Sequence, residues 1–142
     1  MLKILLPVDG SDNSLRAVRH VIEHGDWYRG PLELHLLNVQ LPIASGAVKM
    51  FIAQSQLNDY YREEGLAALI EARAALDAAK LPYQHHVGVG QVGATVSDFA
   101  RNNGCDLIVM GAHGRGAIGG ALLGSVATKV VHLASVPVLL VK

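Results

Sequence analysis

Several features that mark particular classes of protein are scarce in this sequence. The 142 residues include one cysteine, Cys105, which excludes an intrachain disulfide framework and a zinc site built from several cysteines. Charged residues make up only 17% of the chain and hydrophobic residues 51%, the opposite of the balance in disordered chains. The 12 basic side chains are matched by 12 acidic ones, so no positive excess is available for a nucleic-acid backbone.

Long apolar runs are also lacking, and this shapes the expected location. No run approaches the roughly 20 residues that a membrane-spanning helix needs. Residues 1–6 are too short for the apolar core of a signal peptide, and Asp9 interrupts the stretch. The length corresponds to one domain, 1–142, which can bury a core without disulfides or a metal. We therefore expect a single-domain cytoplasmic protein whose partners include neither a membrane nor a nucleic acid.

Short apolar runs alternate with segments of helical periodicity along the whole chain. Their near-continuous apolar character is typical of strands buried on both faces. We predict strands at residues 4–8, 32–39, 83–89, 107–110 and 136–141. Alternation of this kind predicts an α/β fold, a single open five-stranded parallel sheet with helices on both faces.

The segments between the predicted strands differ in character. Leu15, Val18 and Val21 form the apolar stripe of a first helix, for which Ser11 or Asp12 is the expected N-cap. Residues 41–49 contain proline, serine and glycine and are expected to form a mobile connection. Residues 51–80 are expected to be helical, with Gly65 as a weak or kinked position. Two shorter helices are expected between the third, fourth and fifth strands.

Unusual residues follow two of the predicted strands. Asp9 and Gly10 close the first strand, and residues 110–114 close the fourth. In open α/β sheets, ligands bind beyond the carboxyl ends of the strands, where the strand order reverses. If the order is 3-2-1-4-5, the first and fourth strands are neighbours, and both segments face one crevice.

Glycine is concentrated after the fourth strand. Five of the 15 glycines lie between Gly111 and Gly120, where bare backbone N–H groups can form an anion-binding nest. Gly124 and Ser125 then open the last helix, whose N-terminus presents free N–H groups and a partial positive charge. This combination suits a chain of phosphates, with a base held nearer to Asp9.

Familiar phosphate-binding motifs do not account for these glycines. Gly119 and Gly124 have the spacing of a P-loop, but Ser125 follows directly and the required lysine is missing. Residues 88–93 and 114–119 both match GxGxxG, yet neither is followed by the acidic residue that a dinucleotide site needs. Such matches arise easily in a glycine-rich chain and are weak signals.

Several polar residues have a structural explanation as well as a functional one. Asp9 is as readily a helix cap as a ligand contact, since short polar residues are favoured at caps. His113 is expected in the site, although no partner carboxylate supports it as a general base. His85 and His86 are adjacent on a strand and therefore point to opposite faces, which argues against a shared metal. Ser125 lacks an adjacent base, so we predict capping and phosphate contact rather than nucleophilic catalysis.

The glycine pattern resembles a known family. Gly111, Gly114, Gly124 and Ser125 reproduce the G-2x-G-9x-G-S signature of the universal stress protein family, in its UspA-like, ATP-binding subgroup. Residues 3–11, 106–111 and 135–141 resemble the first, fourth and closing strands of that family. The resemblance implies a Rossmann-like, adenine nucleotide alpha hydrolase-like fold that acts in stress survival and is usually a homodimer.

The same resemblance implies which residues bind ATP, with Mg²⁺ or Mn²⁺ accompanying the triphosphate. The implied residues are those of the adenine and ribose pocket (Pro7, Val8, Asp9 and Val39), those beside the ribose and phosphates (Met110, Gly111, His113, Gly114, Arg115 and Gly116), and those that hold the phosphates at the last helix (Gly124, Ser125 and Val126). No catalytic residue and no metal-ligating residue is predicted.

Oligomerisation and catalysis leave alternatives open. In the order 3-2-1-4-5 the final strand lies at an edge, and an edge strand has to be blunted or paired. If residues 136–141 pair with a second copy, the protein is a homodimer, which the resemblance also implies. The predicted function is a nucleotide-dependent stress-response or signalling module. The alternatives are a slow ATPase that uses the same site and a structural dimer that binds no nucleotide.

Overall fold

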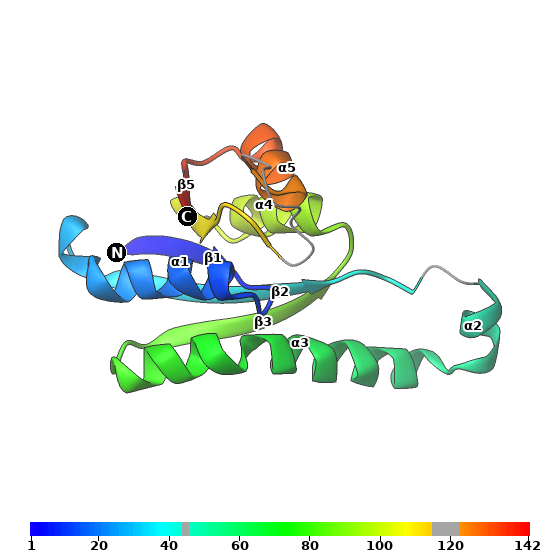
Figure 1. Ribbon diagram of the computed structural model, residues 1–142. Helices are drawn as coiled ribbons and strands as arrows, with labels where there is room; N and C mark the ends of the chain where they lie inside the picture. Colours follow the sequence, from blue (N-terminus) through cyan, green and yellow to red (C-terminus); the bar gives the residue numbers. More distant parts are fainter. Residues whose placement is uncertain (44–45, 115–122) are drawn as a thin grey trace.

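The protein forms a five-stranded parallel sheet. The computed structural model describes residues 1–43, 46–114 and 123–142 (Figure 1). The strands, in chain order, are β1 (Leu2–Pro7), β2 (Leu32–Gln40), β3 (Tyr83–Val89), β4 (Leu107–Gly111) and β5 (Val138–Val141). They are arranged in the order β3-β2-β1-β4-β5, which confirms the predicted order.

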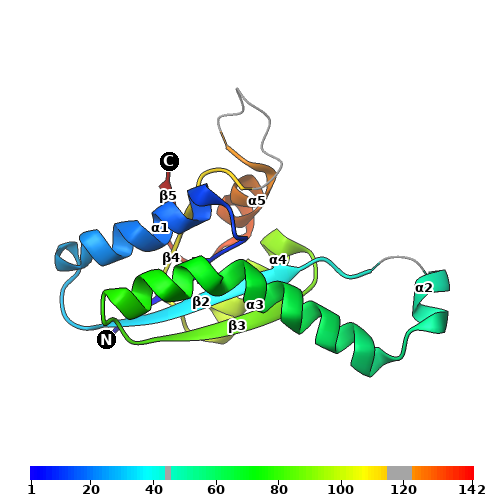
Figure 2. The same cartoon turned by 60° about the horizontal axis from the view of Figure 1, so that its bottom comes forward.

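Helices cover both faces of the sheet. The helices are α1 (Asp12–Glu23), the 3₁₀ turn η1 (Gly25–Trp27), α2 (Gly46–Phe51), α3 (Gln54–Ala78), α4 (Val92–Asn102) and α5 (Ser125–Leu133). Figures 1 and 2 show α1 and α3 on one side of the sheet and α4 and α5 on the other. In the described part of the chain, no helix is both long and apolar enough to cross a membrane.

The central strand shows why the apolar runs are continuous. Ile4 and Leu6 of β1 belong to the core that α1 and α3 cover, whereas Leu5 packs with α4 and α5. All three side chains are completely buried, with exposed fractions of 0%. A strand between two helical layers has no solvent-facing side, so alternation of polar and apolar residues disappears.

Local hydrogen bonds at the start of α1 agree with one of the two predicted N-caps. Ser11 is the N-cap, and its side chain accepts a hydrogen bond from the backbone N–H of Ser14 at 3.2 Å. The carboxylate Oδ1 of Asp9 accepts the N–H of Ser11 at 2.9 Å. The cap role therefore belongs to Ser11, and Asp9 stabilises the turn that precedes the helix.

Some predicted boundaries were wrong, among them that of the first strand, which spans Leu2–Pro7 rather than residues 4–8. Part of the expected connection at residues 41–49 is helical, because α2 begins at Gly46; Figure 2 shows α2 beyond the end of the sheet. The last strand begins at Val138 rather than at residue 136. Pro137 has no N–H for the ladder and contributes only its carbonyl, which accepts the N–H of Ile108 at 3.0 Å.

Gly65 is a packing position in α3, and the helix continues unbroken over 25 residues. A Cβ placed on Gly65 would lie 2.7 Å from Cγ2 of Val87 in β3, which is closer than real side chains approach. The glycine therefore lets α3 lie directly on the sheet, and the burial of the helix outweighs its poor helix propensity. The predicted weak point is a close contact between two elements.

A polar network crosses three strands beneath α4. Nε2 of His35 lies 2.7 Å from Oε2 of Glu33, and Nδ1 of His35 lies 2.9 Å from Nε2 of His86. The ammonium group of Lys3 lies 3.3 Å from the same Glu33 oxygen. His35 is 5% exposed, and the ring of Phe99 from α4 packs against His86. His86 thus has a partner on β2, while His85 faces α3, as expected for neighbours on a strand.

We expect this network to make the protein less stable in mild acid. Burial lowers the pKa of His86 from its usual 6.5, and the neighbouring charges of His35 and His85 lower it further. The folded protein therefore binds this proton more weakly than the unfolded chain does. The stabilisation is complete above pH 6.5 and is lost as the pH falls through the lowered pKa of the folded state.

Urea unfolding at several pH values measures this effect. The free energy of unfolding should fall between about pH 7.5 and about pH 5.5, and His86→Gln, which keeps a donor for His35, should reduce that fall. His85→Gln is the matched control, since its exposed side chain lies on the other face and its charge is the smallest of the causes that lower the pKa of His86. A pH dependence that is the same in both variants and the wild type would contradict the assignment.

Candidate functional site

A cavity of about 540 Å³ opens beyond the carboxyl ends of β1, β2 and β4. The strand order reverses between β1 and β4, so this is the position at which open α/β sheets bind ligands. The cavity walls come from the ends of these strands and from α1, α3, α4 and α5. Segments that are far apart in the sequence therefore form one site.

Most of the residues predicted for the site line this cavity. The lining includes Pro7, Val8, Asp9, Val39, Met110, Gly111, His113, Gly114 and Val126. Gly124 and Ser125 flank the cavity at the start of α5, with Ser125 exposed. Arg115 and Gly116 lie outside the described residues.

Asp9 and Gly114 bring the two sides of the crevice into contact. A Cβ placed on Gly114 would lie 2.5 Å from Oδ2 of Asp9, so the carboxylate occupies the space that a side chain at residue 114 would take. The other oxygen, Oδ1, accepts the N–H of Ser11 at 2.9 Å. The carboxylate is thus held at the junction between the β1–α1 turn and the segment after β4.

The segment after β4 is held at several points. The N–H of Ala112 donates to the carbonyl of Val141 at 2.8 Å, and the N–H of Gly124 donates to the carbonyl of Ala112 at 2.7 Å. The N–H of His113 donates to Oδ1 of Asn13, a residue of α1, at 2.7 Å. These bonds fix residues 112, 113 and 124, which lie at the two ends of the glycine-rich stretch.

The cavity is also lined by polar residues that are not among the predicted site residues. Asn38, which is 3% exposed, donates from Nδ2 to the carbonyl of Val8 at 2.8 Å and accepts from Nε2 of Gln40 at 2.7 Å. Tyr60 and Glu64 of α3 also line the cavity. The one available signal was Asn38 itself, an amide between the apolar Leu37 and Val39 in the second strand. Tyr60 and Glu64 reach the site only through tertiary packing.

The charges at the cavity are negative. Among the described lining residues, Asp9 and Glu64 carry carboxylates, and there is no lysine or arginine. An anion bound here would rely on backbone N–H groups, on the N-terminus of α5 and on a metal ion. No group of three or more histidine, cysteine, aspartate or glutamate side chains in the described chain could hold a metal. Mg²⁺ bound with phosphate oxygens and water needs only one or two carboxylates.

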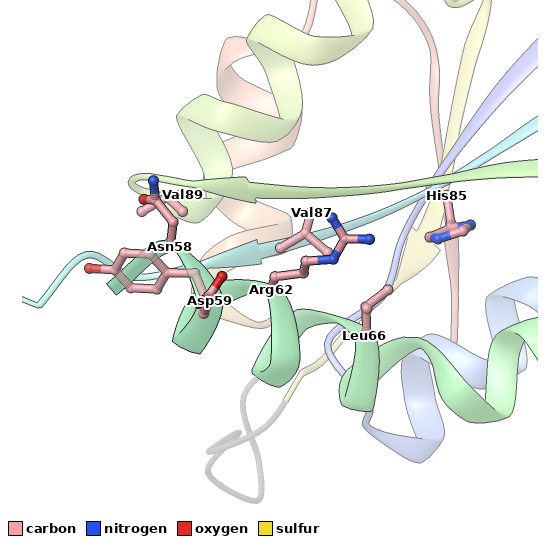
Figure 3. A pocket seen from close by; sticks show the side chains of 8 residues that line it. Asn58, Asp59, Arg62, Leu66, His85, Val87 and Val89 are labelled. Atoms are coloured by element: carbon pink, nitrogen blue, oxygen red, sulfur yellow. The ribbon is translucent and has the colours of Figure 1, made fainter. Parts of the chain in front are cut away.

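A second groove, of about 510 Å³, lies between α3 and the edge strand β3. Leu66, Val87 and Val89 supply its apolar lining, and Figure 3 shows Arg62 reaching from α3 towards β3 beside Val87. His85 also lines this groove. None of the residues predicted for the site is among those that line it, so the crevice at the strand ends is the candidate site.

Comparison with known protein sequences gives similarity over the whole chain. The family model described as the universal stress protein family matches residues 1–142. Universal stress protein MJ0531 of Methanocaldococcus jannaschii is 31% identical over 145 residues, which cover 99% of this chain and 81% of the relative. Universal stress protein G of Escherichia coli O157:H7 is 30% identical over 147 residues, covering 98% of this chain and 97% of the relative.

Solved structures show the same architecture. The structure of hypothetical protein MJ0577 matches with a TM-score of 0.83 and 28% identity, covering 99% of this chain and 95% of that one. A universal stress protein in complex with cAMP matches with a TM-score of 0.69 and 25% identity, covering 99% of this chain and 97% of that one. Both likenesses extend over 99% of this chain.

Proposed function

Because the chain belongs to the universal stress protein family, we propose that it binds an adenine nucleotide in the crevice between β1 and β4, and that this nucleotide is ATP. The observation that carries the proposal is the contact between Asp9 and Gly114, which unites the turn after β1 with the glycine-rich signature after β4. The complex of a related universal stress protein with cAMP supports the choice of an adenine nucleotide.

The proposed contacts follow the geometry of the cavity. Pro7, Val8 and Val39 supply apolar lining and would surround the base, while Asp9 would contact the ribose side. Backbone N–H groups suit the phosphates, since they bind anions without a formal charge. The residues that we assign to the ribose and phosphates are Met110, Gly111, His113, Gly114, Arg115, Gly116, Gly124, Ser125 and Val126.

A divalent cation, Mg²⁺ or Mn²⁺, fits the charge of this site. Asp9 is the lining carboxylate beside the glycine segment, and one carboxylate together with phosphate oxygens and waters satisfies such a cation. The bound ion would offset the negative charge of the triphosphate. Asp9 would hold the ion, while its other oxygen stays bonded to Ser11.

The assembly and role that we propose are a cytoplasmic homodimer that signals according to its bound nucleotide. β5 lies at an edge of the sheet, where residues 136–141 can pair with a second copy (Figure 1). Val131 and Leu133 of the adjacent α5 are 49% and 40% exposed, which offers apolar surface for the same contact. Binding with little turnover is expected, because the described lining residues include no lysine or arginine to stabilise a transferring phosphoryl group.

Isothermal titration with ATP, ADP, AMP and adenosine tests the proposal. We expect ATP to bind in the presence of Mg²⁺ and to bind more weakly when EDTA removes the cation, because the lining carboxylates then oppose the phosphates. Mass spectrometry of gently denatured protein should also find a copurified adenine nucleotide. Absence of binding by all four compounds, with no copurified nucleotide, would overturn the proposed function.

A further inference from the structure

We propose that Asn13 is a positioning residue for the phosphate-binding segment after β4. Its side chain holds His113 against α1, and in this way it sets the affinity for the phosphates of the nucleotide without touching the nucleotide itself. This inference rests on the proposed function. It assigns to an α1 residue a role that neither its position in the sequence nor the glycine signature indicates.

The contact is direct and joins distant parts of the chain. Oδ1 of Asn13 accepts the N–H of His113 at 2.7 Å, across 100 residues of sequence, and the bond is partly buried. This is at the short end of the range for N–H···O bonds. Asn13 is not among the residues that line the cavity, whereas His113 and Gly114 are. Any influence of Asn13 on a ligand must therefore pass through the backbone at His113.

Helix capping does not explain the asparagine. Short polar residues are common in the first turn because they satisfy free N–H groups of the helix. In α1 this role is filled by Ser11, whose side chain accepts the N–H of Ser14 at 3.2 Å. Oδ1 of Asn13 instead accepts a hydrogen bond from the N–H of His113, outside its own helix.

Packing at Gly111 brings Asn13 to this position. A Cβ on Gly111 would lie 2.9 Å from the backbone carbonyl carbon and oxygen of Asn13, so the first turn of α1 rests directly on the end of β4. The side chain of Asn13 then reaches the N–H two residues further along. Backbone packing and side-chain hydrogen bonding thus act on the same short segment, residues 111–113.

The effect of losing the Asn13 bond should depend on whether the ligand carries phosphates. Without an acceptor, the partly buried His113 N–H is left unpaired, and the segment that carries Gly114 can turn to satisfy it elsewhere. The strand ends that would surround the base are held separately, through the bond from Asn38 to the carbonyl of Val8. Loss of the Asn13 bond should therefore weaken binding of ATP and leave binding of adenosine nearly unchanged.

The test compares ATP with adenosine in titration calorimetry, using the full chain. Asn13→Leu keeps the approximate size of the side chain and removes the acceptor, and it should weaken ATP binding by about tenfold, with adenosine within about twofold. Asp12→Leu is the matched control, since the neighbouring Asp12 is exposed in the same helical turn. Asn13→Ala replaces the leucine variant if the latter does not fold.

Hydrogen exchange at the His113 amide provides the second readout. Exchange should be faster in Asn13→Leu than in the wild type, and Asn13→Asp, which retains an acceptor oxygen, should restore slow exchange. An unchanged ratio of ATP to adenosine affinity in both Asn13→Leu and Asn13→Ala would overturn the inference, as would equal weakening of both ligands. If the wild type binds neither ligand, the proposed function itself fails, and the inference fails with it.

Discussion

Gly114→Ala is expected to weaken ATP binding by about tenfold to a hundredfold while the protein remains folded. The added Cβ would lie 2.5 Å from Oδ2 of Asp9, so the carboxylate has to leave its place beside the glycine segment. Gly114 does not have a positive φ, and alanine therefore adds no backbone strain. The magnitude corresponds to one hydrogen bond or ion contact of a charged group, about 1.5–3 kcal/mol.

Titration calorimetry with ATP and Mg²⁺ measures this loss, and thermal unfolding confirms that the variant is folded. Gly25→Ala is the matched control, because nothing lies within 4 Å of a Cβ at that glycine. An affinity of Gly114→Ala equal to that of the wild type would mean that the contact with Asp9 has no part in binding.

A double-mutant cycle can assign the effect to the Asp9 carboxylate. Asp9→Asn keeps an oxygen for the N–H of Ser11 and removes the charge that would hold a metal ion. If Gly114→Ala acts by displacing this carboxylate, the double variant should bind ATP little worse than either single variant. Additive losses would instead indicate that the two residues contact the ligand independently.

Gly111→Val should lower the free energy of unfolding by about 3 kcal/mol, the upper end of the usual cost of overpacking. Valine is otherwise favoured in strands, so local propensity predicts the opposite sign. The loss is expected because the new Cβ would lie 2.9 Å from the backbone of Asn13, and backbone atoms at the start of α1 cannot rotate away as a flexible side chain can.

Urea denaturation followed by circular dichroism measures this change. The control is Gly25→Val, at which the side chain meets open space and the expected change is below about 1 kcal/mol. Equal stability of Gly111→Val and the wild type would show that α1 can move away from β4 without cost. The close approach at Gly111 would then have no structural significance.

Local sequence determined the layers of this fold. Runs such as residues 4–8 are apolar without alternation because two helical layers enclose the strand, and the stripe through Leu15, Val18 and Val21 marks the buried face of α1. The strand order 3-2-1-4-5 was an assumption that places the unusual residues after the first and fourth strands in one crevice, and the structure confirms it. The principal lining residues from β1 and β4 could be predicted for the same reason: the carboxyl ends of adjacent parallel strands share one edge of the sheet.

Only the tertiary structure decided which distant residues touch. Gly65 looks like a defect in an isolated helix and becomes a contact with Val87 once α3 lies on the sheet. The bonds from His35 to His86 and from His113 to Asn13 join residues 51 and 100 positions apart. Periodicity and local propensity indicate which face of its own helix or strand a residue occupies, and whether that face is buried. Close contacts between elements depend on how the layers are packed, and this is why the glycine signature could locate the crevice but could not reveal the asparagine behind it.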